Sequence, residues 1–198
     1  MDCVTDDGWK PLVDFHGHMC PGLAVGARAV AIGLRELAGG SPLQPLRVLA
    51  ETAMCSVDAV QHLTGCTLGN GGLVFRDHGK NAFTFIGGPE GRAVRVVAKP
   101  DALPPDPEHA QLRRRADAGV ATEVERARYV ELHLARAQLI LDLPESRLFT
   151  VSTEDVAPPI LSERTQEAVL CSHCRETVMR TRSIETEHGS RCIPCADR

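Results

Sequence analysis

The stretch Leu73–Ala98, LVFRDHGKNAFTFIGGPEGRAVRVVA, decides the fold that this sequence predicts. It contains three short runs rich in β-branched and aromatic residues, 73–76, 82–86 and 93–98, and Gly87-Gly88-Pro89 separates the last two. Runs of this composition bounded by turn residues are typical of strands, and short connections favour antiparallel neighbours. The sequence therefore predicts an antiparallel meander over these residues.

Two helices and a further strand are predicted ahead of the meander. From Pro21 to Leu37 apolar residues recur at helical spacing, and the following Gly-Gly-Ser-Pro ends the pattern. Arg47–Thr52 predicts a strand that leads into a short helix over 55–63, with Cys55 or Ser56 as the N-cap of that helix.

The residues after the meander predict a long helix, a last strand and a separate tail. Pro100–Pro107 is rich in proline and aspartate, which is typical of a loop. Val120–Leu141 places apolar residues on one helical face, and Leu148–Ser152 predicts a returning strand. We therefore expect an α+β fold, with an antiparallel sheet and packed helices forming a metal-binding core domain over 1–160, followed by a small four-cysteine zinc-finger domain over 165–198.

The composition argues against some classes of partner. The formal net charge is -4 and the pI is about 6.1, which argues against nucleic acid or an anionic membrane surface. No apolar run reaches the roughly 18–20 residues of a membrane helix, and the first residues are acidic where a signal peptide is basic. We therefore expect a cytoplasmic protein with no membrane partner. In that reducing compartment, cysteines that gather in pairs or near histidines indicate metal rather than disulfides.

The tail carries the strongest motif in the sequence. Cys171 and Cys174 form one Cys-x-x-Cys pair, and Cys192 and Cys195 form a second pair after 17 intervening residues. Four thiolates at this spacing predict a closed tetrahedral zinc site, with two disulfides or a redox-active pair as the alternatives. Zinc binding in such modules contributes about 10–16 kcal/mol, which lets a segment with few apolar side chains fold.

A second candidate site lies in Phe15–Gly22, FHGHMCPG. Pro21 suits the first position of the helix, so Cys20 becomes its N-cap and the sulfur lies among free backbone N–H groups that favour a thiolate. His16 and His18 occupy alternate positions ahead of Cys20. In an extended segment both rings would point to one side.

Cys55 lies in a matching setting, because it also precedes a helix. Two thiols at two helix starts converge if the helices lie side by side. The sequence therefore predicts a core site in which His18, Cys20 and Cys55 bind zinc or another transition metal and leave one coordination position open. Two alternatives stay open. Either His16 or Cys66 completes a closed structural site, or these side chains are ordinary structural residues.

These motifs, taken with ETAMCSVDAVQHLTGCTLGNGGL at 51–73 and with CSHC and RCIPC in the tail, resemble the E-subunit family of formylmethanofuran dehydrogenase. The resemblance covers nearly the whole chain. It implies an α+β core, an intertwined homodimer, a core metal bound by His and Cys, and a C-terminal zinc finger. It places the core metal motif on His18, Cys20 and Cys55. The surrounding pattern falls on His16, Asp58, Gln61 and Cys66.

The sequence departs from the family pattern at two places. Arg175 follows the first cysteine pair of the tail where the family usually has glycine, so the tight turn there must accept a costlier backbone or another shape. Leu68–Gly72 lacks the basic residue of the corresponding family stretch, so any anion contact made by that residue is lost.

Three classes of function fit these observations. The preferred one is a metal-binding accessory protein whose finger docks a partner such as an oxidoreductase complex. The chain has no iron–sulfur run and no pterin-binding domain, so it cannot carry out formylmethanofuran chemistry alone. The apolar face of Val120–Leu141 is the reason to expect a homodimer. The alternative is a zinc-dependent enzyme that uses the open coordination position, with Asp58 or His16 as proton carrier. A nucleic-acid-binding regulator is disfavoured by the acidic balance.

Overall fold

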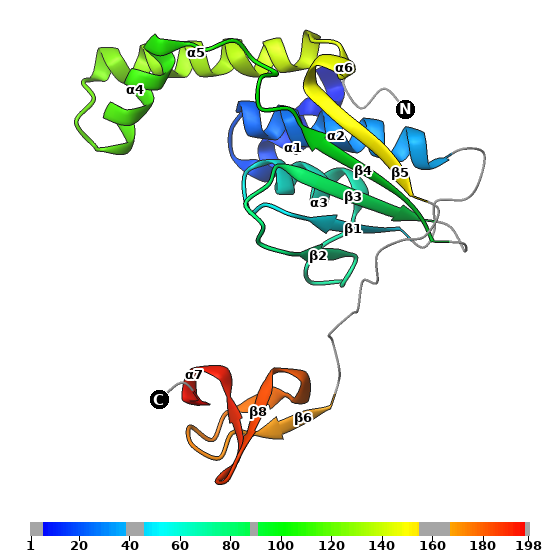
Figure 1. The fold of residues 1–198 in the computed structure, drawn as a ribbon. Coiled ribbons are helices and arrows are strands. Elements are labelled where there is room, and N and C mark those ends of the chain that lie inside the picture. The colour runs from blue at the N-terminus through cyan, green and yellow to red at the C-terminus, as the bar shows by residue number, and fades with distance from the viewer. Residues whose placement is uncertain (1–5, 39–45, 88–90, 155–166, 197–198) are drawn as a thin grey trace. The chain divides into compact units, whose positions relative to one another are not determined.

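The computed structural model describes residues 6–38, 46–87, 91–154 and 167–196. The chain forms two compact units, Met1–Ile160 and Leu161–Arg198. Figure 1 shows the mixed α+β architecture of the first unit.

The first unit is built on a five-stranded sheet with the order β2-β1-β3-β4-β5. Its strands are β1 (Arg47–Ala50), β2 (Leu73–Phe75), β3 (Ala82–Gly87), β4 (Arg92–Ala98) and β5 (Phe149–Glu154). Every neighbouring pair is antiparallel except β1 and β2, which are parallel. The expected fold class, α+β with an antiparallel-dominated sheet, is therefore confirmed.

The predicted meander is correct for β3 and β4 and wrong for β2. Strand β1 lies between β2 and β3, so the segment 76–81 is not a hairpin turn. The reason lies in burial. All six residues of β3 are buried, as are three of the four in β1, so these two apolar strands share the interior, and β2 takes the edge with Phe75 41% exposed. Turn residues show where a strand ends but not which strand becomes its neighbour.

Three helices pack together beside this sheet: α1 (Asp6–His16), α2 (Pro21–Ala38) and α3 (Ser56–Thr64). Helix α2 contacts β3, β4 and α3, and most of its apolar residues are buried, which confirms the helix predicted from Pro21. Gly26 allows the close approach of α2 and α3, because a Cβ at this position would lie 2.3 Å from the Ser56 carbonyl oxygen. This approach sets the two helix starts beside each other.

Helix α1 was not predicted, and the expectation of an extended segment at His16 is wrong. The helix runs through His16 and buries Leu12, while Pro11 and the adjacent polar residues obscure its apolar spacing. Gly17 ends it with a φ of 95°, and its amide donates to the Val13 carbonyl oxygen. A glycine directly after a helix is a common stop signal, and it could have indicated this boundary.

A pair of helices follows the sheet strand β4. Helix α4 (Pro107–Asp117) is capped by Asp106, and α5 (Glu123–Asp142) begins with a capping box between Thr122 and Glu125. The predicted long helix is thus present, although Val120 lies before its start. A short helix, α6 (Glu145–Leu148), leads into β5. Figure 1 shows α5 passing over α2 while its first half pairs with α4 beyond the sheet.

The second unit has two small antiparallel sheets. They are formed by β6 (Ala168–Leu170) with β7 (Thr177–Met179), and by β8 (Ser183–Thr186) with β9 (Gly189–Cys192). A 3₁₀ turn, η1 (Arg180–Arg182), and a short helix, α7 (Ile193–Ala196), complete it. Among residues 167–196 the only buried residues are Cys171 and Cys195. The centre of this unit is therefore made of thiols.

None of the helices in the described ranges has the length and apolar character needed to cross a bilayer.

Candidate metal centres

The first candidate centre lies where three helices of the core meet. His16 ends α1, Cys20 immediately precedes α2, and Cys55 is the N-cap of α3. One ligand atom from each residue lies within 4.8 Å of the other two, and the Cys20 Sγ and His16 Nε2 atoms are 3.7 Å apart. Two sulfurs and one imidazole nitrogen form a donor set that suits zinc and related transition metals.

Asp58 fixes the orientation of the His16 ring. An Asp58 carboxylate oxygen lies 2.7 Å from Nδ1 of His16, which is mostly buried with 8% of its side chain exposed. With Nδ1 engaged, Nε2 faces the Cys20 thiol and is free to coordinate. A carboxylate behind a histidine in this way holds the ligating nitrogen in place and raises its basicity.

The two thiols differ in their surroundings. Cys20 is buried, and the Leu23 amide donates to its sulfur over 3.3 Å. Burial raises the pKa of the Cys20 thiol, and the Leu23 amide opposes that rise. Cys55 makes no capping hydrogen bond with its side chain, so its sulfur is not committed to the α3 terminus. A bound cation would supply the charge that a buried thiolate needs.

Gly22 lets the two thiols converge. A Cβ at this position would lie 2.9 Å from the Cys55 Cβ, and 3.7 Å and 3.8 Å from the sulfurs of Cys55 and Cys20. Any side chain here would push the α2 start away from Cys55. Sequence reasoning did not single out Gly22, because this requirement arises only from the packing of α2 on α3.

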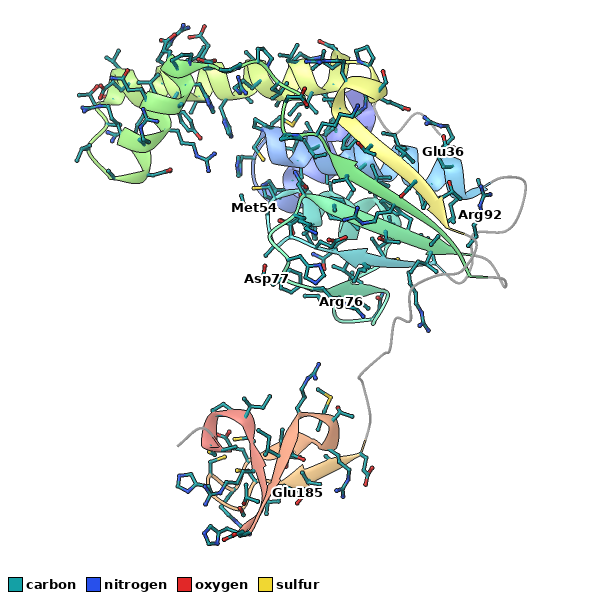
Figure 2. All side chains as sticks on the ribbon, in the orientation of Figure 1. Glu36, Met54, Arg76, Asp77, Arg92 and Glu185 are labelled. Carbon is teal, nitrogen blue, oxygen red and sulfur yellow. The ribbon has the colours of Figure 1, made fainter. Side chains whose placement is uncertain are left out.

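The loop that carries Cys55 reaches the surface. Met54, labelled in Figure 2, is 59% exposed, whereas the following thiol is half-buried. Cys55 is therefore the more exposed of the two thiols.

The other residues of the predicted core pattern lie outside this group of three. His18 is exposed, and its ring packs against that of His16 in a tilted arrangement at a centroid distance of 4.7 Å. Gln61 is half-buried in α3. Cys66 donates from its sulfur to the Leu46 carbonyl oxygen. It follows the C-cap of α3, roughly 15 Å along that helix from Cys55. The group therefore contains His16, not His18.

Three aromatic rings of the helical pair form a cluster that the sequence analysis did not single out. His109 of α4 stacks on His133 of α5 at an interplanar angle of 6°, and their ring nitrogens are 2.9 Å apart. Tyr129 packs against both rings. Burial raises the pKa of Tyr129.

The second candidate centre is the four-cysteine group of the C-terminal unit. The sulfurs of Cys171, Cys174, Cys192 and Cys195 all lie within 4.8 Å of one another, and none is in a disulfide. The Cys192 amide donates to the Cys171 sulfur over 3.4 Å, and backbone amides, that of Cys192 first, lower the pKa of the Cys171 thiol to about 6. One cluster of four free thiols fits a closed tetrahedral metal site rather than two disulfides.

The turn after the first cysteine pair uses a strained backbone. Arg175 has a φ of 65°, and it is the only residue other than glycine with a positive φ in the described ranges. Its amide donates to the Cys171 carbonyl oxygen, which closes the turn. Of the two outcomes expected for the missing glycine, the structure has the costlier backbone.

The fold and these groups define a class of protein: an α+β core with a His/Cys cluster at its helix ends, followed by a separate four-cysteine unit consistent with a zinc finger. Residues 15–150 match the profile of the family described as "FmdE, Molybdenum formylmethanofuran dehydrogenase operon". The chain belongs to the FmdE family, as the motifs of the sequence indicated.

Two known proteins are similar to this chain. A protein of Archaeoglobus fulgidus named "Probable S-adenosyl-L-methionine-binding protein" is 30% identical over an alignment of 195 residues, and the match covers 92% of this chain and 50% of that protein. The chain thus spans about half the length of this curated relative. The crystal structure of a tungsten formylmethanofuran dehydrogenase FmdE-like protein from Syntrophus aciditrophicus has a TM-score of 0.63 and 24% identity, covering 96% of this chain and 91% of that one. This likeness concerns the fold.

Proposed function

We propose that this chain is a metal-binding accessory protein with a transition metal in its core and a zinc ion in its C-terminal unit. The observation that carries the proposal is the convergence of His16, Cys20 and Cys55, with Asp58 behind His16. In the core, the proposed ligand set replaces the expected His18 with His16, because His16 lies in the group and His18 does not. Zinc suits both donor sets.

A matched pair of histidine variants tests the ligand set. We expect His16→Ala, Cys20→Ser and Cys55→Ser each to remove the core metal ion while the C-terminal ion remains, as counted by elemental analysis of the purified full chain. His18→Ala is the control, and it should retain both ions. Loss of the core ion in His18→Ala with retention in His16→Ala would restore the original assignment.

A zinc-dependent enzyme is the second candidate function. Among the described residues no fourth His, Cys, Asp or Glu joins the group, and three protein ligands leave zinc one coordination position for a substrate or water. The proton of an incoming group would pass to a neighbouring base. Asp58, with 39% of its side chain exposed and already bonded to His16, is the carboxylate placed to accept it.

The proposed partners are a second copy of the chain and an oxidoreductase complex. Val124, Val130 and Leu134 of α5 are 80%, 53% and 43% exposed, which leaves an apolar face for a second copy. The four-cysteine unit has no open coordination position, so its role beyond folding is to dock a protein. Co-purification of the tagged full chain with and without the double change Cys171→Ser and Cys174→Ser tests this docking. A partner retained equally by both would contradict it.

Half of the Archaeoglobus fulgidus relative lies outside the matched region, so the S-adenosylmethionine binding in its name is not assigned to this chain.

A further inference from the structure

A cavity of about 270 Å³ lies between α2, α5 and the segment that follows β4. Its apolar surface includes Ile140, Leu148 and Phe149, which belong to the main hydrophobic core and are 2%, 2% and 4% exposed. Val25 and Leu103 also line it. Ligand cavities in proteins typically hold about 300–1,000 Å³, so this one suits a small molecule with an apolar body.

Two cationic side chains line the same cavity. The Lys99 ammonium donates to the Ser146 carbonyl oxygen at 2.7 Å and faces no carboxylate among the described residues. Arg136 donates to the Pro104 carbonyl oxygen at 3.2 Å and forms a long ion pair with Asp106 at 3.9 Å. Lys99 is thus the cation without a carboxylate partner among the described residues, so the cavity has a net positive charge beside an apolar surface.

Asn81 supplies a neutral polar contact in this cavity. Its side-chain oxygen accepts a hydrogen bond from the Ser56 hydroxyl at 3.0 Å, and its amide nitrogen has no acceptor within the described part of the chain. The amide can therefore donate to a bound ligand. Because Ser56 follows Cys55, the cavity is also linked by one hydrogen bond to the α3 start that carries a proposed metal ligand.

We propose that this cavity binds a small organic carboxylate with an apolar body. The apolar part would lie on Ile140, Leu148 and Phe149, and the carboxylate would bond to Lys99 and Arg136. A guanidinium matches the planar geometry of a carboxylate, and the apolar side chains that line the cavity suit the apolar body of the ligand. This inference goes beyond the proposed metal binding and does not depend on it.

The first test compares probes that differ only in charge. Benzoate and hexanoate, with benzamide and hexanamide as neutral controls, are titrated into the full metal-loaded chain and followed by amide chemical shifts in NMR. We expect millimolar or tighter binding of the carboxylates, with chemical-shift changes at Asn81, Lys99 and Arg136. The amides should bind at least about tenfold more weakly, because they lack the charge that strengthens a hydrogen bond to a cation. Equal affinity for acid and amide, or no shifts at millimolar concentration, would overturn the proposal.

The second test uses variants. Lys99→Gln and Arg136→Gln should each weaken carboxylate binding about tenfold while both metals remain bound. Ala102→Phe fills the cavity without changing charge and should abolish carboxylate binding. Arg114→Gln on the exposed surface of α4 should leave carboxylate binding unchanged. Cys20→Ser should lose the core metal but keep carboxylate binding. Undiminished binding in folded Lys99→Gln and Arg136→Gln would overturn the proposal, whatever the state of the metal centre.

Discussion

At the residue scale, the absence of a side chain at Gly22 is as important to the core centre as its ligands. We expect Gly22→Ala to abolish binding of the core metal, because the added methyl group would contact Cys55 and separate the two thiols. Overpacking of this kind costs about 1–3 kcal/mol. Elemental analysis and a thermal melt measure both effects. Gly69→Ala is the matched control, since a Cβ there meets nothing closer than 3.7 Å. Retention of the core ion in Gly22→Ala would contradict the proposed geometry.

At Arg175, in contrast, the presence of a side chain lowers the stability of the C-terminal unit. We expect Arg175→Gly to stabilise the C-terminal unit by about 1–2 kcal/mol, because glycine adopts a φ of 65° without the steric penalty of a Cβ. Resistance to a zinc chelator should rise accordingly, since zinc affinity and folding are coupled. Arg175→Ala removes the same charge but keeps the Cβ. If it stabilised the unit as much as glycine, charge rather than backbone strain would be the cause.

At the scale of the elements, the exposed apolar face of α5 leads to a prediction about oligomeric state. The full chain should be a dimer in light scattering, and the double change Val124→Glu and Leu134→Glu should produce monomers, because charges on this face oppose burial against a second copy. Gln111→Glu on the exposed surface of α4 adds charge elsewhere and should leave the dimer intact. A wild-type monomer at micromolar concentration would refute this.

The stacked imidazoles between α4 and α5 make the helical pair sensitive to acid. Burial, and then the neighbouring His109, lower the pKa of His133 to about 4, below its ordinary value of 6.5. Between pH 4 and pH 6.5 the unfolded chain therefore binds more protons than the folded chain. The contribution of His133 to the free energy of unfolding is fully present above about pH 6.5 and is lost as the pH falls toward 4. We expect a loss of about 1 kcal/mol, allowing for solvent screening. His133→Asn should flatten this part of a pH series of denaturant melts, and an unchanged slope would disprove the assignment.

Local patterns predicted the elements better than their arrangement. Helical spacing after Pro21 and the strands around Phe85 were sufficient to define α2, β3 and β4. The position of β1 was not predictable, because strand order depends on burial across the whole sheet. Cys20 and Cys55 were singled out from their places at helix starts. The choice between His16 and His18 depended on α1, whose short apolar pattern is interrupted by proline, so the sequence did not indicate that His16 lies beside Cys20 and Cys55.

At the scale of the whole molecule, the two units should respond differently to metal removal. The C-terminal unit buries little besides Cys171 and Cys195, whereas the first unit has an extensive apolar core. We expect a strong chelator to unfold only the C-terminal unit, since metal binding of about 10–16 kcal/mol replaces a hydrophobic core there. Limited proteolysis should then cleave after Leu161 while 46–154 stays protected, and restored zinc should reverse this. A tail that resists protease without metal would show that it folds unaided.

The meeting of three helix ends at one point has a consequence for local motion. A cation held there by the end of α1 and the starts of α2 and α3 would act as a crosslink between segments 39 residues apart in sequence, from position 16 to position 55. Helix α1 is outside the sheet, and its apolar contacts are confined to a small cluster that Trp9, Leu12 and Val13 join. Its amide hydrogens should exchange with solvent slowly when the cation is present and rapidly when it is lost. The exchange rate of the α1 amide hydrogens would then show whether the core centre holds its cation.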